Sequence, residues 1–304
     1  MPGGLSRGPM YLNKVMSLFQ HILFPVDFSE RSDAAAPFVL SMAQRNHARV
    51  TTIHVVQPAP PIYGAMNSVY PDTIDYVEIQ NILRKRLREF AENELPKVET
   101  VAVVEVGDPA AVIAEYAAAH HVDLIAMPTN GYGAFRRMLL GSVTAKVLHD
   151  AKVPVWTAAH APEPSHRAHP LPRHIVVALD LRPESRETMA RALELAQNSG
   201  ADLEILHVAP EGETVPEAAE RRVQDVVAEV AREQVVKVHQ DSGGEPGVIL
   251  TGGSIAVQLR TVAIRKRADL VVIGRGSIQA GIMHRLLANS YDIIREAPCP
   301  VLSV

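Results

Sequence analysis

Two glycine-containing turns stand close together in residues 130–146, NGYGAFRRMLLGSVTAK. The first holds Gly131 and Gly133, and the second, Gly141-Ser142, begins a helical pattern. A phosphate group needs unhindered backbone N–H donors, which glycine leaves accessible and which a helix N-terminus supplies together with a positive dipole end. The stretch is therefore either a phosphate-binding loop or a pair of ordinary turns with an N-cap serine.

The surroundings of these turns decide between the two interpretations. Ser142 and Thr144 add hydroxyl donors at the helix start, and Arg136 and Arg137 add positive charge. By themselves the glycines favour ordinary turns. Asp27, however, ends an apolar run that predicts a strand, and open α/β sheets bind ligands beyond the carboxyl ends of strands, where the strand order reverses. The coincidence favours nucleotide binding.

The sequence around these residues occurs twice in the chain, as an internal repeat. The run HILFPVDF, which contains Asp27, matches HIVVALDL, which contains Asp180, at an offset of 153 positions. VDLIAMPTN, with Asp123, matches ADLVVIGRG, with Asp269, at an offset of 146. Repeats of this length indicate a duplicated domain, because solenoid repeats run to only about 20–50 residues.

Within each copy, short apolar runs alternate with helical patterns. In the first copy the predicted strands are 21–27, 50–56, 101–106, 123–127 and 153–158, and the predicted helices are about 30–46, 73–94, 109–121 and 141–150. This alternation predicts an α/β protein with two repeated, doubly wound, Rossmann-like parallel sheets of five strands. In the second copy the repeat register places the third strand at 247–252 and assigns 235–240 to the end of a helix that begins at about 215.

The repeat divides the chain into four segments. We expect a disordered extension at 1–17, a nucleotide-competent domain at 18–158, a linker at 159–172 and a second domain with a degenerate site at 173–304. The four prolines of the linker and its lack of periodicity predict a semi-extended chain. Its histidines are irregularly spaced, which favours a solvated linker over a metal site.

The bulk composition excludes several classes of function. The net charge is −4 and 47% of the residues are hydrophobic, so a packed core is expected and a basic nucleic-acid-binding surface is not. No apolar run approaches the roughly 18 residues of a membrane-spanning helix, and the N-terminus lacks a signal-peptide pattern. Cys299 is the single cysteine, which fits a reducing compartment. We expect a cytoplasmic protein with no nucleic-acid or membrane partner.

Over nearly its whole length the chain resembles a tandem pair of domains of the universal stress protein family. The resemblance rests on HILFPVDFSERSDAAAPFVLSMA, TTIHVV, VGDPAAVIAEYAAAHHVDLIAMPTNG and LLGSVTAKVLHDAKVPV. ATP-binding members of the family resemble G-x2-G-x9-G-[ST] after the fourth strand. Gly131, Gly141 and Ser142 match this pattern, whereas Pro128 replaces the first glycine and removes one backbone donor.

The resemblance implies that the first domain binds ATP or another adenine nucleotide. It implies that Asp27 and the backbone of Val55 face adenine and ribose, and that Gly131 through Ala134 and Ser142 through Thr144 hold the phosphates. The implied binding residues are Pro25, Asp27, Val55, Pro128, Thr129, Asn130, Gly131, Tyr132, Gly133, Ala134, Gly141, Ser142, Val143 and Thr144. A Mg or Mn ion held by the phosphates needs no protein ligand, and no residue is assigned a catalytic or metal-binding role.

The second copy departs from the phosphate pattern. Gly274 keeps the first glycine, but Ser277 replaces the second, and Leu287-Ala288 replace the Gly-Ser pair. A leucine at the helix start would crowd the phosphate, so we expect no phosphate binding in this copy. We interpret Arg275 as a surface residue, with filling of the vacated phosphate space as the alternative.

Each copy ends in an apolar strand after a proline, at 153–158 and 299–304. In this strand order the last strand is a sheet edge, and an apolar edge needs covering. Single-domain relatives resemble dimers that pair through this strand. We therefore expect an intramolecular pseudo-dimer with Val155 and Val301 at the interface, and leave a further homodimer open.

Three functions remain in competition. The first is a cytoplasmic stress-response module that binds ATP in its first domain and regulates without catalysis. The second is a slow ATPase or nucleotide-dependent transferase on the same scaffold. The third is a structural or interaction protein with both sites inactive, for which Pro128 is the main argument.

Overall fold

The computed structural model describes residues 18–58, 75–128, 140–157, 172–183, 185–209, 218–233, 246–275 and 283–304. For 231–233 and 283–289 it describes the backbone alone. The predicted extension at 1–17, nearly all of the linker and residues 235–240 lie outside the described residues.

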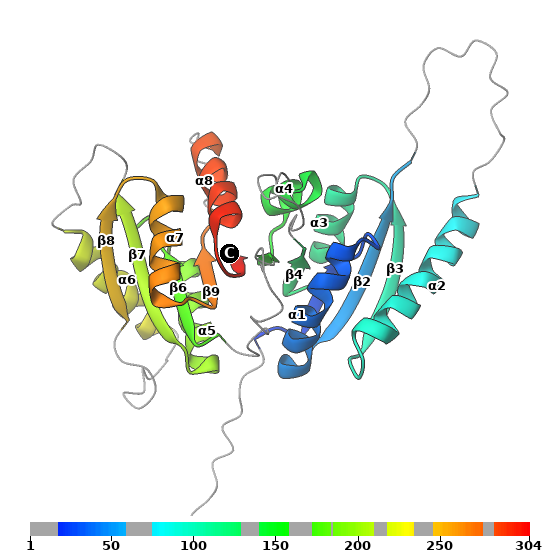
Figure 1. Cartoon of the computed structure of the whole chain (residues 1–304), viewed down its shortest axis with the longest axis horizontal. Helices are drawn as coiled ribbons and strands as arrows, with labels where there is room; N and C mark the ends of the chain where they lie inside the picture. The colour runs from blue at the N-terminus through cyan, green and yellow to red at the C-terminus, as the bar shows by residue number, and fades with distance from the viewer. Residues whose placement is uncertain are drawn as a thin grey trace, which may run out of the picture.

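Two successive sets of strands and helices make up the fold (Figure 1). The first half comprises β1 (His21–Pro25), α1 (Glu30–Asn46), β2 (Arg49–Val56), α2 (Tyr76–Glu94), β3 (Thr100–Val106), α3 (Pro109–Ala119), β4 (Leu124–Met127), α4 (Ser142–Asp150) and β5 (Val155–Thr157). The second half comprises β6 (His174–Ala178), α5 (Ser185–Ser199), β7 (Asp202–Ala209), α6 (Ala219–Glu233), β8 (Gly247–Gly252), α7 (Ile255–Lys266), β9 (Leu270–Ile273), α8 (Met283–Glu296) and β10 (Val301–Ser303). The predicted α/β alternation is confirmed, including β8 at 247–252.

All strands join one ten-stranded sheet, in the order β3-β2-β1-β4-β5-β10-β9-β6-β7-β8. Within each half the strands pair in parallel. The two halves meet through β5 and β10, which pair antiparallel with Leu302 opposite Trp156. The expected intramolecular pseudo-dimer is therefore confirmed, with Val155 opposite Ser303 and Val301 opposite Thr157.

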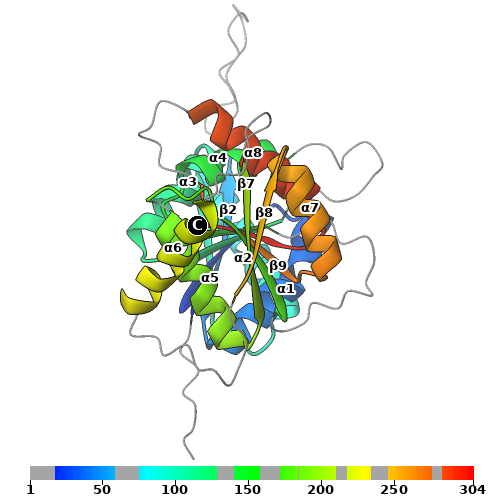
Figure 2. The ribbon, with the colours of Figure 1, turned by 90° about the vertical axis from the view of Figure 1, so that its left-hand side faces the viewer.

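Helices cover both faces of this sheet, so the core has two layers. Helices α1, α2, α5 and α6 contribute to one buried cluster, and α3, α4, α7 and α8 contribute to the other. Figure 2 shows α5 and α6 on one side of β7 and β8, with α7 on the other side. Every residue of β1 and of β4 is buried, because helices cover both faces of these strands, and this is why their side chains are apolar at nearly every position.

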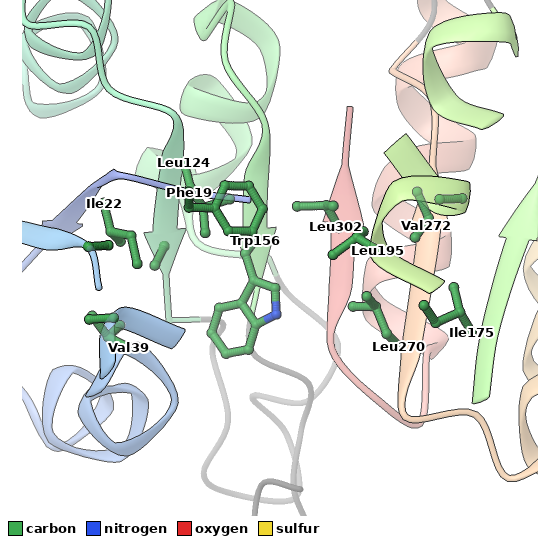
Figure 3. Close-up of a cluster of buried hydrophobic side chains, with 14 of the residues drawn as sticks. Phe19, Ile22, Val39, Leu124, Trp156, Ile175, Leu195, Leu270, Val272 and Leu302 are labelled. Carbon is green, nitrogen blue, oxygen red and sulfur yellow. The ribbon is translucent and has the colours of Figure 1, made fainter. Parts of the chain in front are cut away.

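Both clusters continue across the junction between the halves. Trp156 on β5 packs against Phe38 of α1, with ring centroids 5.3 Å apart, and faces Leu302 and Leu195 of the second half (Figure 3). The Thr157 hydroxyl donates to the carbonyl of Val301 at 3.2 Å. The junction is therefore a packed continuation of the core.

The duplication extends to details of the backbone. His54 Nδ1 hydrogen-bonds the carbonyl of Val26 at 2.7 Å, and His207 Nδ1 hydrogen-bonds that of Leu179 at 2.8 Å. These four positions obey the offset of 153. The repeat seen in the sequence is thus a repeat of structure, so the two halves can be compared position by position.

Candidate functional site

The strand order reverses at β1, which lies between β2 and β4. Both neighbours run parallel to β1, with Pro25 opposite Ile53 and Leu23 opposite Ile125. The carboxyl ends of all three strands therefore lie at one edge of the sheet. This is the position at which open α/β sheets bind ligands.

Four of the predicted site residues lie at or just after the ends of these strands. Pro25 is the last residue of β1 and Asp27 comes two residues later, Val55 is the last but one residue of β2, and Pro128 directly follows β4. Val55 packs into the cluster on the α3 and α4 face, together with Leu140 and Val143. The structure thus brings Val55 and the start of α4 to the same face of the sheet.

Asp27 is an exposed residue whose carboxylate is held in place. Its Oδ1 accepts from the Ser29 amide at 3.0 Å, the Ser29 hydroxyl at 2.5 Å and the Ser32 hydroxyl at 2.8 Å. Burial by itself would raise the pKa of Asp27, but the hydrogen bonds from Ser29 and Ser32 outweigh it and lower the pKa. Among the described residues no hydrogen bond ends on Oδ2, so this oxygen can accept from a ligand hydroxyl.

Phe28 is a feature of this edge that the sequence reasoning missed. Its φ of 58° lies in the left-handed region, which a bulky residue rarely adopts, and the equivalent Leu181 has a φ of 59°, so this conformation belongs to the duplicated turn. Its ring centroid lies 4.7 Å from that of His54, and the Arg86 guanidinium carbon lies 4.2 Å from the ring centroid. The only available signal was an aromatic residue directly after Asp27, because these contacts join three separate elements.

The start of α4 is the part of the site that can hold an anion. Gly141 is the N-cap residue, with φ −57° and ψ 140°, and no side chain caps the helix. Ser142 is exposed, while the buried Thr144 donates its hydroxyl to the carbonyl of Pro128 at 3.5 Å. The first N–H groups of a helix have no partner within the helix. The Thr144 contact places these donors next to the end of β4.

Pro128 is explained by its surroundings when the two halves are compared. In the second half its equivalent is Gly274, and a Cβ atom there would lie 2.7 Å from the Thr188 hydroxyl oxygen. The first-half equivalent of Thr188 is Ala35, which has no such hydroxyl. A side chain is therefore excluded after β9 but accommodated after β4.

In the second half the equivalent aspartate, Asp180, has different hydrogen-bond and ion-pair partners. Asp180 Oδ1 accepts from the Ser185 hydroxyl at 2.6 Å and from the Arg182 amide at 3.1 Å. Its Oδ2 lies 3.5 Å from Nε of Arg182. Both carboxylate oxygens of Asp180 thus already have partners.

The interpretation of Arg275 as a surface residue is wrong. Arg275 is half-buried, and its guanidinium donates to backbone carbonyls at the C-terminal end of α4 in the other half. Burial lowers the pKa of Arg275, an effect that Glu187 opposes. Cys299 is buried, and burial raises the pKa of its thiol to about 12.

Part of the predicted site cannot be placed. Thr129, Asn130, Gly131, Tyr132, Gly133 and Ala134 lie outside the described residues, as does Ser277, and the side chains of Leu287 and Ala288 are not described. Within the described ranges, no three His, Cys, Asp or Glu side chains gather to hold a metal ion. None of the described helices is both long and apolar enough to cross a membrane.

Fold and site together define a tandem α/β protein with two parallel units joined edge to edge. The profile of the universal stress protein family matches residues 18–158 and again 172–304. The chain belongs to the universal stress protein family.

Individual relatives agree with this assignment. A universal stress protein of Methanocaldococcus jannaschii, MJ0531, is 33% identical over 143 residues, which cover 46% of this chain and 81% of the relative. One from Mycolicibacterium smegmatis is 26% identical over 190 residues, covering 62% of this chain and 63% of the relative. The crystal structure of a universal stress protein from Archaeoglobus fulgidus covers 95% of this chain and 96% of its own, with a TM-score of 0.67 at 22% identity, which shows the shared fold.

Proposed function

We propose that the first half of this universal stress protein binds ATP or another adenine nucleotide, and that the chain acts as a cytoplasmic regulatory module of a stress response. Base and ribose would lie beside Pro25, Asp27 and Val55, and the phosphates at the start of α4. Any Mg or Mn ion would be held by the phosphates. The division into domains at 18–158 and 173–304, joined by a linker at 159–172, is part of this proposal.

The observation that supports the proposal most strongly is the start of α4. Its N-cap residue, Gly141, has no side chain to cap the helix or to obstruct an approaching anion. Next to it Ser142 is exposed and offers a hydroxyl. Free N–H groups and the positive end of the helix dipole make such a start a binding site for phosphate.

Asp27 supports the part of the proposal that concerns the sugar. A carboxylate at the end of a sheet strand can accept hydrogen bonds from ribose hydroxyls, and Oδ2 is the oxygen without a partner among the described residues. Phe28 and His54 lie at the same edge of the sheet but on the α1 and α2 face, opposite Val55 and the start of α4, so they add no support to the proposal.

Calorimetry on the full chain tests the proposal. The expected result is saturable binding of ATP with one site per chain, and weaker binding of adenosine, which lacks the phosphates. A chain that binds neither would favour the structural protein with both sites inactive. Sustained phosphate release at saturating ATP would favour the enzyme instead, and its absence together with tight binding would favour the regulatory module.

A further inference from the structure

The C-terminal end of α4 and the residues that follow it are held from the second half through backbone carbonyls. Arg275, two residues after β9, places Nη1 at 2.6 Å from the carbonyl oxygen of Ala151 and at 3.5 Å from that of Leu148. Its Nη2 lies 2.9 Å from the carbonyl oxygen of Val153. The Arg275 amide donates to the carbonyl of Val304 at 2.9 Å, which fixes the residue beside β10.

A second hydrogen bond from the second half reaches the same helix near its middle. Tyr291 on α8 donates its hydroxyl to the carbonyl of Ala145 at 2.9 Å. Figure 1 shows α8 and α4 facing each other where the two halves meet. Burial raises the pKa of Tyr291. Arg275 and Tyr291 together are called the α4 clamp below.

The helix that the α4 clamp contacts is too short to be stable by itself. Helix α4 has nine residues, about 13 Å of length, and helices this short are not stable by themselves in water. Its last carbonyls lack partners within the helix and form the negative end of its dipole. The Arg275 guanidinium contacts the carbonyl of Leu148 in the last turn of α4 and those of Ala151 and Val153 just beyond it, so its positive charge lies near the negative end of the dipole. At the N-terminal end no side chain caps the helix.

We propose that Arg275 and Tyr291 are positioning residues for the nucleotide site of the opposite half: the second half holds α4 by its carbonyls, so that the N–H groups at Gly141 and Ser142 are fixed where phosphates bind. This inference rests on the proposed function. It gives the second half a role in binding without a nucleotide site of its own. Because linkage is reciprocal, phosphate binding at α4 also strengthens the contact between the halves.

The test compares two ligands on full-length variants. Arg275→Ala and Tyr291→Phe remove the clamp, and Arg275→Lys restores a positive charge with fewer donors. Arg260→Ala is the matched control, because Arg260 pairs with Glu296 in the second half at 3.4 Å. Emission of Trp156, the single tryptophan, reports whether the junction stays packed in each variant.

We expect Arg275→Ala to weaken ATP binding about tenfold and Tyr291→Phe a few-fold, within the usual range of couplings between sites. Adenosine affinity should stay within about twofold, because adenosine makes no phosphate contact with α4. Arg275→Lys should recover part of the loss, and Arg260→Ala should resemble the wild type. Hydrogen exchange of the α4 amides in the ligand-free chain should speed up in Arg275→Ala.

The outcomes separate the two proposals. Unchanged ATP affinity in Arg275→Ala overturns the inference, even if exchange in α4 speeds up. An equal loss of ATP and adenosine binding also overturns it, because that pattern indicates a general structural defect. A wild-type chain that binds no adenine nucleotide refutes the proposed function and the inference together.

Discussion

The two halves hold equivalent aspartates in equivalent turns, but leave them in different states. Ser32 and its equivalent Ser185 bond Asp27 and Asp180 in the same way, at 2.8 and 2.6 Å. At the next position that contacts the carboxylate, the first half has Ser29 and the second has Arg182. The shared hydrogen bond shows that the aspartate organises the helix start in both halves, so its presence alone does not indicate a binding site.

The difference lies in what remains available to a ligand. Arg182 occupies Oδ2 of Asp180, whereas Oδ2 of Asp27 has no partner among the described residues. At the helix that would meet the phosphates, Gly141 corresponds to Leu287. The duplicated scaffold is kept in both halves, and the features suited to binding differ between them.

The largest effect is expected where the halves are joined. Deleting residues 299–304 removes β10 and exposes the apolar edge of β5, so we expect nearly complete loss of the soluble monomer to aggregates or new dimers. Light scattering measures the mass, and a red shift of Trp156 emission reports the opened junction. Leu302→Val, which keeps the strand, serves as the control. A truncated chain with unchanged mass and stability would show that the halves are independent.

The next effect concerns the phosphate end of the site. Gly141→Leu copies the second half into the first, and we expect ATP affinity to fall at least about 100-fold, or about 2.7 kcal/mol, because a side chain blocks the anion. The φ of −57° at Gly141 suits any residue, so the fold should persist. Gly141→Ala should give a smaller loss. A folded leucine variant with unchanged ATP affinity would place the ligand elsewhere.

A stability comparison tests the steric difference after β9 and β4. Gly274→Ala should cost about 1–3 kcal/mol, because the new Cβ atom meets the Thr188 hydroxyl oxygen. Adding Thr188→Ala, which copies Ala35, should recover much of this loss in a double-mutant cycle by urea unfolding. Pro128→Ala should cost less than about 1 kcal/mol. Additive effects of Gly274→Ala and Thr188→Ala would contradict the steric account.

The smallest effect concerns the charge on Asp27. Its pKa is lowered in the folded chain, so the folded state binds fewer protons than the unfolded state, whose pKa is near 3.8. The stabilisation is therefore full above about pH 4 and is lost as pH falls through the folded pKa. Unfolding of wild type and Asp27→Asn between pH 7 and 3 should show a difference that shrinks at acid pH. Ser32→Ala removes one of the hydrogen bonds that lower the pKa of Asp27, so the pH range over which Asp27 affects stability should become narrower. A difference in stability between wild type and Asp27→Asn that does not depend on pH would show that the charge of Asp27 does not stabilise the fold.

Local patterns were enough to predict the scaffold. The strand before Asp27 and the strand at 299–304 are apolar runs bounded by polar or proline residues, so their positions and their pairing could be inferred from the sequence. Strand bounds were less accurate: the strand predicted at 153–158 begins at Val155 in β5, and residue 158 lies outside the described residues.

Contacts between distant elements could not be predicted. Arg275 has no local partner that identifies it, and its acceptors are backbone carbonyls more than 120 residues away in the chain. Phe28 takes its place from a backbone conformation that its residue type disfavours. The acceptor carbonyls belong to the backbone, and the left-handed φ falls on a residue type that rarely adopts it, so neither could be inferred from the side chains.

Because β5 and β10 belong to one chain, their pairing has a consequence for how the sequence of this protein can evolve. In a dimer of identical chains, every substitution at a twofold interface appears on both sides at once and must be tolerated twice. Here a mutation changes one side only. The position equivalent to Arg275 in the first half is Thr129, so an arginine that grips one helix has no duplicate on the other side. One chain thus carries both surfaces of the junction, which are always present in equal amounts. The two surfaces can therefore diverge, and one half can specialise in supporting the other.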